Sequence, residues 1–289
     1  MSAGGAKVML VAHRERAAET AATVVAWLRE REIAVWAQPT EADRIGLSEI
    51  GADRPVDEAD VVISLGGDGT MLRAAHLLDG APVPLLGVNL GRLGYLTEVD
   101  PDHVADALDR WYRGESDGGW HIDERMLLDI SVVDTAGAVV GTFRALNEVV
   151  AEKSDAGRTV GLLVHIDGER FTSYAADGLI VSTPTGSTAY SMSARGPSVS
   201  PKHRALLVTP VAPHMLFDRS LVLDPTETVD IEVVGDRTAA IAVDGQRVAE
   251  LGEGGSISCA PSSATVRFIR FGEHRYHQVL RAKFGLTDR

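Results

Sequence analysis

The first third of the sequence alternates short apolar segments with longer amphipathic ones, and this alternation constrains the fold more than any other feature. Apolar runs of strand length occur at 7–12, 33–37, 59–65 and 84–88. Residues 17–32, between the first two runs, carry a partial apolar stripe at helical spacing. Strands that alternate with helices pair in parallel through right-handed crossovers. We therefore expect an open α/β domain over residues 1–120.

The pattern changes after about residue 120 to strand-like runs separated by turn signals. Asp167-Gly168 and Asp244-Gly245 each lie between apolar segments, which is typical of a tight β-hairpin. We expect residues 121–270 to form a second, β-rich and sandwich-like domain that packs closely on the first and leaves a cleft. Within the terminal segment, 271–289, residues 276–284 are expected to form a helix that packs back on the first domain.

Composition excludes several classes of protein. The 289 residues carry a formal net charge of -13 with no basic cluster, which argues against a nucleic-acid partner. The single cysteine, Cys259, permits no intrachain disulfide and no thiolate zinc site, and it fits a reducing cytoplasm. The apolar run near the N-terminus is too short for a signal peptide or a membrane span. We expect a cytoplasmic protein with no membrane contact and no metal site built from protein ligands.

Residues 66–70 read Gly-Gly-Asp-Gly-Thr between an apolar run and a predicted helix over 70–78. Gly66, Gly67 and Gly69 let the backbone approach a ligand closely, and peptide N–H groups at a helix start bind anions. The spacing fits neither a Walker A loop nor GxGxxG, and no lysine follows. The pattern predicts a phosphate site, with a ligand-free strand-to-helix turn as the open alternative.

Asp68 is the unexpected residue in this loop, because a carboxylate beside phosphates costs Coulomb energy unless a cation intervenes or the group handles a proton. It is therefore a candidate base for phosphoryl transfer to a hydroxyl, with helix capping as the alternative. Arg73, about one helical turn further on, is a candidate phosphate ligand; a surface arginine is the alternative.

Two further polar clusters interrupt apolar runs. Asn147-Glu148 can offer an amide to a base edge and a carboxylate to ribose hydroxyls, although a bulge or a solvated strand edge explains the pair equally well. Residues 177–197 are rich in hydroxyls and small side chains, which suits a close-fitting nucleotide surface, with a Ser/Thr-rich turn as the alternative. Tyr190 is a candidate for stacking on a ring. The hydrogen-bonding candidates in this segment are Asp177, Thr185, Thr188 and Ser193.

Together these segments resemble the NAD kinase family, ATP-dependent and sometimes polyphosphate-dependent enzymes that make NADP. The matching stretches are, in chain order, 65–70, 89–96, 147–148, 177–193, 209–214 and 244–246. GGDG alone also occurs in lipid kinases and 6-phosphofructokinases, whereas GGDG with NE and DGLIVSTPTGSTAYS is highly specific. The resemblance implies a Rossmann-like N-terminal domain, a β-rich C-terminal domain with NAD bound between them, Mg²⁺ with ATP, and a homo-oligomer, commonly a tetramer.

The resemblance also implies roles for individual residues. Asp68 would contact the adenosine ribose and act as base on its 2′-hydroxyl, and Asn147 and Glu148 would hold the adenine and the ribose hydroxyls. Asp177 and Ala189 would lie near the nicotinamide end, with Tyr190 packed on the nucleotide. The further nucleotide contacts that we expect are Arg158 and Gln246.

Two other functions share parts of the pattern. A lipid or sugar kinase would share the glycine-aspartate loop, but this acidic chain shows no basic or apolar membrane face in its sequence. A regulator that senses NAD(H) without chemistry would not need Asp68 or Glu148, and both residues are present.

The sequence departs from the family pattern at two places. Arg195 stands where the family usually has glycine, and Asp218-Arg219-Ser220 stands where Arg-Pro is more common. Both departures bear on the local shape of the backbone rather than on the chemistry.

Overall fold

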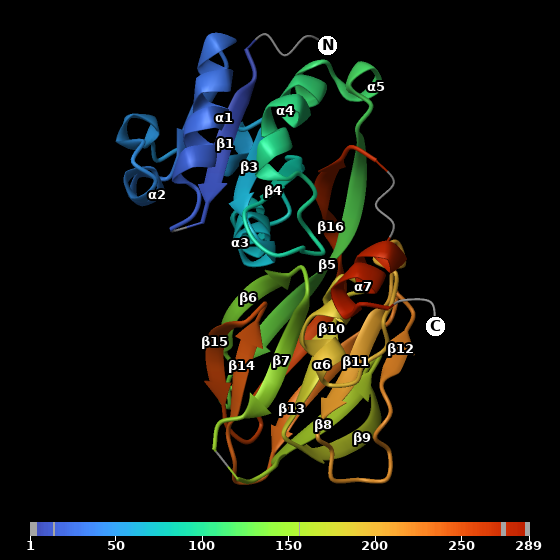
Figure 1. Cartoon of the computed structure of the whole chain (residues 1–289). Helices are drawn as coiled ribbons and strands as arrows, with labels where there is room; N and C mark the ends of the chain where they lie inside the picture. The colour runs from blue at the N-terminus through green and yellow to red at the C-terminus, as the bar shows by residue number, and fades with distance from the viewer. Residues whose placement is uncertain (1–4, 14, 156, 273–275, 287–289) are drawn as a thin grey trace. The chain divides into compact units, whose positions relative to one another are not determined.

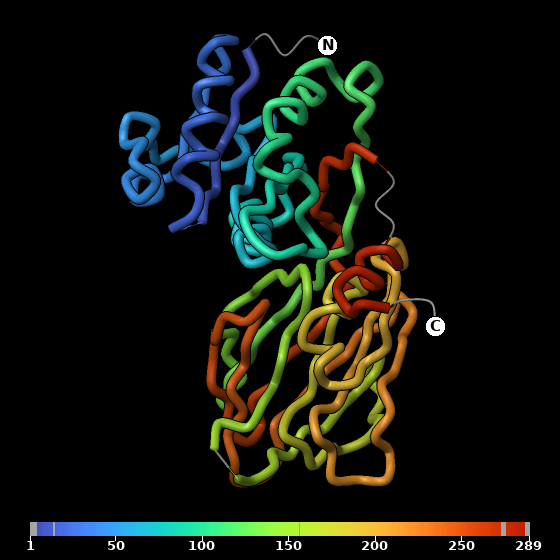
Figure 2. Tube along the Cα trace, in the orientation of Figure 1, coloured from blue at the N-terminus to red at the C-terminus, as the bar shows by residue number. Residues whose placement is uncertain are grey.

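The computed structural model describes residues 5–13, 15–155, 157–272 and 276–286. The chain forms two compact units, of which unit 1 comprises Met1–Glu124 with Val266–Arg289 and unit 2 comprises Arg125–Thr265. The chain passes between the units within two long strands, β5 (His121–Val133) and β16 (Ser256–Arg270). The end of β16, red in Figure 2, therefore joins the blue-to-green part of the chain in unit 1.

Unit 1 contains a parallel sheet in the order β2-β1-β3-β4, followed by the end of β16, whose Phe268 pairs in parallel with Leu85 of β4. The expected open α/β arrangement is confirmed. Its elements are β1 (Lys7–Ala12), α1 (Ala18–Glu30), β2 (Ala34–Ala37), α2 (Pro39–Arg44), β3 (Val61–Gly66), α3 (Asp68–Leu78), β4 (Leu85–Asn89), α4 (Val104–Tyr112), α5 (Glu115–Gly118) and α7 (Tyr276–Phe284).

Helices cover both faces of this sheet (Figure 1). Val8 and Leu10 of β1 share one core cluster with the buried side chains of α1 and α4, so these two helices pack on the same face. The helix α3 packs against β1, β3 and β4 and buries Met71, Ala74 and Ala75, which lie outside that cluster. Buried strands between two helical layers explain why the strand segments of the first third are apolar throughout rather than alternating.

Unit 2 is a β sandwich, as the second half of the sequence predicts. One sheet has the order β12-β11-β10-β7-β14-β15, and the strands β8, β9 and β13 pair antiparallel in the other. Besides the parts of β5 and β16, its elements are β6 (Val139–Ala145), β7 (Glu148–Lys153), β8 (Val160–Ile166), β9 (Glu169–Ala176), β10 (Gly178–Ser182), α6 (Tyr190–Ser193), β11 (Leu206–Val211), β12 (Leu221–Leu223), β13 (Val229–Val234), β14 (Ala239–Val243) and β15 (Gln246–Leu251).

Alternating side chains fill the space between the two sheets. Val160, Leu162 and Val164 of β8 are fully buried in one cluster with Leu179 and Val181 of β10. The two expected hairpins are β8–β9 and β14–β15, and the aspartate and glycine of each turn have positive φ. Positive φ at both central positions defines the type I′ turn, which matches the twist of paired strands.

The expected C-terminal helix is α7, and the Lys283 ammonium lies 4.0 Å from the centroid of the Tyr95 ring. Among the described residues, no helix is long and apolar enough to cross a membrane.

Arg195 occupies a backbone conformation that disfavours its side chain. Arg195 follows α6, and its φ of 66° lies in the left-handed region, which glycine adopts without steric cost. The family's usual glycine at this position therefore has a physical reason, and Arg195 carries a local conformational cost. No side-chain hydrogen bond or ion pair of Arg195 with the other described residues offsets this conformational cost.

Replacing Arg195 by glycine should stabilise the protein. The left-handed conformation costs an L-residue about 1–2 kcal/mol, and the extra freedom of glycine in the unfolded chain takes back about 0.5–1 kcal/mol. We expect Arg195→Gly to raise the free energy of unfolding by about 0.5–1 kcal/mol, as measured by urea denaturation. Arg219→Gly, the same change at an exposed residue without positive φ, should give no gain. Equal effects of the two substitutions would contradict this assignment.

Candidate active site

The glycine-aspartate segment forms the turn between β3 and α3. Gly66 ends β3, Gly67 is the residue before the helix, and Asp68 is its first residue. A Cβ atom at Gly66 would collide with the side chain of Thr70, so the close approach of strand and helix requires glycine there. The turn therefore presents the N-terminal end of an 11-residue helix at the carboxyl edge of the sheet.

The carboxylate of Asp68 is held by two peptide groups. Its Oδ2 accepts the N–H of Tyr95 at 2.9 Å, and its Oδ1 accepts the N–H of Leu96 at 3.0 Å. Gly94 passes so close that a Cβ atom there would collide with Oδ1. The expected alternative of a capping aspartate does not describe this geometry, because the carboxylate binds the loop after β4 rather than the N–H groups of its own helix.

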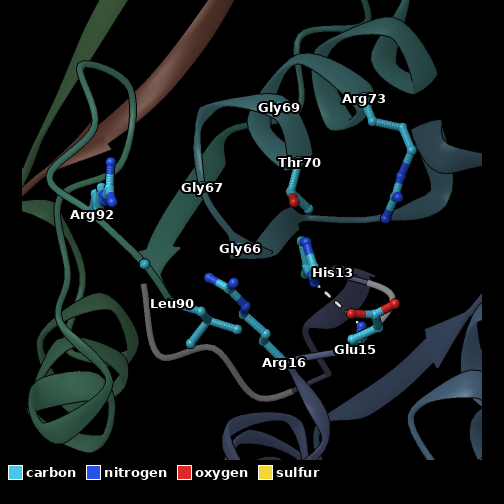
Figure 3. Close-up of a pocket in the computed structure, with 11 residues that line it drawn as sticks. His13, Glu15, Arg16, Gly66, Gly67, Gly69, Thr70, Arg73, Leu90 and Arg92 are labelled. Atoms are coloured by element: carbon cyan, nitrogen blue, oxygen red, sulfur yellow. Dashed lines mark hydrogen bonds between the residues drawn. The ribbon is translucent and has the colours of Figure 1, made fainter.

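A cavity of about 630 Å³ lies beside this turn (Figure 3). Its lining comes from segments that follow β1, β3 and β4, namely His13, Glu15, Arg16, Gly66, Gly67, Gly69, Thr70, Arg73, Leu90, Gly91 and Arg92. In open α/β sheets, ligands bind outside the carboxyl ends of the strands. The cavity therefore occupies the ligand position of this fold, and three of the predicted glycines line it.

The basic side chains that line the cavity differ in whether they form ion pairs within the protein. Within the described part of the chain, Arg16 and Arg92 are exposed and have no ion-pair partner. His13 Nδ1 accepts the N–H of Glu15 at 3.2 Å. Figure 3 shows His13 and Arg16 directed toward the turn at Gly66.

Arg73 lines the cavity next to the turn, and its side chain also contacts groups of the protein. Its guanidinium forms an ion pair with Glu41 and donates to the carbonyl of Ala12 at 2.6 Å. Burial raises the pKa of Glu41, and the adjacent peptide N–H of Ala12 and the Arg73 charge oppose that rise. Arg73 lines the cavity, but it also ties α2 and α3 to the end of β1.

In unit 2, the Asn147-Glu148 segment is fixed by Asp244. The Asp244 carboxylate accepts the N–H groups of Leu146, Asn147 and Glu148 at 2.8, 2.8 and 3.0 Å. Glu148 opens β7, which pairs with both β10 and β14, so the pair lies on an inner strand and not on a solvated edge. The turn of the β14–β15 hairpin thus positions two of the predicted binding residues.

Glu148 is a buried carboxyl with a free oxygen. Its side chain is buried, and its Oε2 has no hydrogen-bond partner among the described residues. Burial first, and the nearby Asp244 charge second, raise the pKa of Glu148 to about 8, against a smaller opposing effect of the Tyr190 peptide N–H. Buried polar atoms in folded proteins are normally paired, so this carboxyl oxygen is available to a further hydrogen-bond partner.

Tyr190 lies within electrostatic range of Glu148, Glu152 and Asp177. Burial raises the pKa of Tyr190, and the charges of Glu152, Asp177 and Glu148 add to the effect. Asp177 Oδ1 accepts from Lys153 Nζ at 2.6 Å. Tyr190 therefore senses acidic groups at both ends of β7, with Glu148 at one end and Glu152 and Asp177 toward the other.

The other predicted residues of unit 2 are more scattered. Thr185 is buried, and its carbonyl accepts the hydroxyl of Thr188 at 3.1 Å in the short turn that leads through Ala189 to Tyr190. Ser193 is exposed at the end of α6, and Gln246 is exposed just after the turn that contains Asp244. Arg158 is exposed in the connection from β7 to β8, beyond the end of β7 that is opposite to Glu148.

Several residues around Asp68 in unit 1 and around Glu148 in unit 2 were not predicted from the sequence. Arg92, Tyr95 and Leu96 belong to the segment 89–96 that resembles the family, but no role was expected for them. His13 and Arg16 carried no signal beyond their place after a strand, and Glu152 carried none. Such residues become visible only when the ends of separate strands are brought together.

Two family matches cover most of the chain. Residues 8–116 match the family described as ATP-NAD kinase N-terminal domain, and residues 146–271 match the ATP-NAD kinase C-terminal domain. The chain belongs to the NAD kinase family. A relative named NAD kinase from Syntrophotalea carbinolica is 38% identical over 92% of this chain and 93% of its own length. Another from Geobacter metallireducens is 36% identical over 96% of both chains.

Solved structures of NAD kinases share the fold. Yeast NADH kinase complexed with NADH superposes with a TM-score of 0.88 at 24% identity, covering 99% of this chain and 89% of the other. An NAD kinase from Archaeoglobus fulgidus in complex with ATP gives a TM-score of 0.71 at 23% identity, with 96% and 97% coverage. The two-part fold expected from the resemblance is thereby confirmed.

The raised pKa of Glu148 predicts a pH dependence of stability. The folded protein keeps this carboxyl protonated up to about pH 8, whereas its ordinary pKa is 4.5. Folding therefore loses stability as the pH rises between these values, by an amount on the order of a few kcal/mol. Glutamine stays neutral, so the stability of Glu148→Gln relative to the parent should rise over the same range in urea denaturation. Glu169→Gln, at an exposed residue, controls for loss of a surface charge. A relative stability that is equal at pH 5 and pH 8.5 would contradict the assignment.

Proposed function

We propose that this member of the family transfers the terminal phosphoryl group of ATP to the adenosine 2′-hydroxyl of NAD, which forms NADP and ADP. The observation that carries the proposal is a carboxylate fixed beside a glycine turn and a cavity lined by unpaired cations. Phosphoryl transfer needs mostly positioning and neutralisation of charge, together with an acceptor for the proton of the nucleophile. Family membership supplies the identity of the two substrates.

Asp68 acts as the base in this proposal. Each of its oxygens accepts one peptide N–H, which leaves further lone pairs on both oxygens for the substrate. The 2′-oxygen attacks the terminal phosphorus as Asp68 takes its proton, the bond from that phosphorus to the ADP oxygen breaks, and ADP leaves with the electron pair. The carboxylate contributes both orientation and proton removal.

The cavity beside Asp68 is the place for the phosphates of the donor. Peptide N–H groups at the start of α3 and the guanidinium groups of Arg16 and Arg92 supply the positive potential that a triphosphate requires. Magnesium enters as part of the substrate, bound to the phosphates, since Mg²⁺ is usually held by substrate phosphates with one or two carboxylates. The same cations would hold inorganic polyphosphate, the other donor implied by the resemblance.

In unit 2, Glu148, Asn147 and Tyr190 hold the adenosine of NAD. The protonated carboxyl of Glu148 can donate one hydrogen bond and accept another, which suits a ribose hydroxyl or a base edge. The free Oε2 atom supports this role. Asp177, Thr185, Thr188, Ala189, Ser193, Gln246 and Arg158 complete the proposed set of nucleotide contacts.

Location and assembly rest on the sequence alone. We place the protein in the cytoplasm because its single cysteine fits a reducing compartment. A homo-oligomer, commonly a tetramer, follows from the family resemblance.

Asp68→Asn tests the proposed chemistry. Asparagine keeps the shape of the side chain and removes the base, so we expect turnover to fall by about 100-fold or more. NADP formation from NAD, ATP and Mg²⁺ is followed with a dehydrogenase that accepts only NADP, and NAD binding should change little. Asp106→Asn, at an exposed residue of α4, is the matched control. Near-normal turnover of Asp68→Asn would overturn the base assignment. A parent protein that binds NAD without forming NADP would be a sensor.

Arg16 and Arg92 are tested through the donor. We expect Arg16→Met and Arg92→Met each to raise the KM for ATP by about tenfold, the effect of losing one charge-assisted contact of about 1.4 kcal/mol. The KM for NAD should stay the same, and inorganic polyphosphate should show the same loss where it serves as donor. Arg54→Met removes an arginine paired with Glu58 and should not change either KM. An unchanged KM for ATP in both variants would place the donor phosphates elsewhere.

A further inference from the structure

Leu96 is held from two sides by groups far apart in the sequence. Its N–H donates to Asp68 Oδ1 at 3.0 Å, and its carbonyl oxygen accepts from Arg270 Nη1 at 3.0 Å. Asp68 and Arg270 therefore both form hydrogen bonds with the backbone of Leu96, one with its N–H and the other with its carbonyl. The adjacent Tyr95 supplies the other N–H that Asp68 accepts.

Arg270 is itself held by ion pairs with two carboxylates, those of Glu98 and Asp123. Its side chain is 1% exposed, and it lies 3.1 Å from Glu98 Oε2 and 3.3 Å from Asp123 Oδ2. The other oxygen of Glu98 accepts the N–H of Phe271 at 2.6 Å. A buried ion pair adds little net stability in comparison with apolar packing, but the planar guanidinium holds its partners in a defined geometry.

The loop that carries the two N–H groups is joined to β3 and β4 by backbone hydrogen bonds at both of its ends. It leaves β4 where Leu90 N–H donates to Gly66 at 3.1 Å, and it rejoins β4 where Val99 accepts from Asn89 at 2.7 Å. Residues 91–93 of this loop are exposed, whereas Gly94, Leu96 and Thr97 are buried and Lys283 lies over the Tyr95 ring. Among the described residues, the bond from Arg270 to the Leu96 carbonyl is the side-chain hydrogen bond that holds the backbone next to the two N–H groups that bind Asp68.

We infer that Arg270 is a positioning residue, which fixes the Tyr95 and Leu96 N–H groups and through them the carboxylate of Asp68. This inference rests on the proposed role of Asp68 as the base. Arg270 is remote from the substrate in this account, so its loss should leave substrate binding largely intact and impair the chemical step. Displacing a catalytic group by about 1 Å can cost about 100-fold in rate.

The test compares Arg270→Met and Arg270→Lys with the parent. We expect kcat to fall by about 10- to 100-fold in Arg270→Met while the KM for NAD changes less than about threefold. Arg270→Lys keeps a cation that can donate to the Leu96 carbonyl, so it should recover part of kcat. Arg31→Met is the matched control, since Arg31 is a partly buried arginine that binds Asp109 and the Trp27 carbonyl, away from this loop.

Hydrogen exchange supplies a readout that does not depend on turnover. The Tyr95 and Leu96 amides should exchange at least about tenfold faster in Arg270→Met and in Asp68→Ala, but not in Arg31→Met. If Arg270→Met does not fold, Glu98→Gln serves in its place, because it removes the charge paired with Arg270 but keeps an acceptor for the Phe271 N–H. It should lower kcat and speed amide exchange by smaller factors than Arg270→Met. A folded variant with parental kcat and parental protection of both amides would overturn the inference. It would do so without touching the base assignment, which fails only if Asp68→Asn retains turnover.

Discussion

Two hydrogen bonds from consecutive peptide groups to one carboxylate organise the carboxyl edge of unit 1. Asp68 is the first residue of α3, and the N–H groups of Tyr95 and Leu96 hold both of its oxygens. These bonds tie the loop after β4 to the turn after β3, and Gly94 permits the close approach. A negative charge can therefore stand next to an anion cavity in a fixed orientation, with unpaired arginines to balance it.

The carboxylates of the two units illustrate how environment sets the role of one chemical group. Asp68 is half-buried and has a peptide donor for each oxygen. Glu148 is buried beside the Asp244 charge, has one oxygen without a hydrogen-bond partner in the part of the chain that the structure describes, and has its pKa raised to about 8. The first arrangement suits a base, and the second suits a neutral group that both donates and accepts hydrogen bonds to a nucleotide.

Local signals in the sequence were sufficient for the fold class. Buried parallel strands appear as continuous apolar runs, and the Asp-Gly pairs at 167–168 and 244–245 are read directly as type I′ hairpins because few residues tolerate positive φ. The glycine-aspartate turn was visible for a different reason, since its glycines allow close approach of the backbone and at Gly66 a Cβ atom would collide with Thr70. These features depend on residues adjacent in the chain.

The supporting contacts of the site could not be predicted from the sequence, because they join segments distant in the chain. Arg270 reaches Leu96 across 174 positions, and Asp244 binds the Glu148 peptide across 96. Arg73 was expected to bind a phosphate, and its ion pair with Glu41 was not expected because no local pattern singles out this buried residue. Periodicity and turn chemistry carry no information about such pairs.

The central claim concerns the hydroxyl that receives the phosphate, and the structure of the product tests it most directly. The protein would be incubated with NAD, ATP and Mg²⁺, and the purified dinucleotide product examined by ³¹P and ¹H NMR. The account predicts one new phosphomonoester, coupled to the 2′ proton of the adenosine ribose, formed in equal amount to ADP. A phosphate on any other hydroxyl, or ADP released without a phosphorylated dinucleotide, would contradict it.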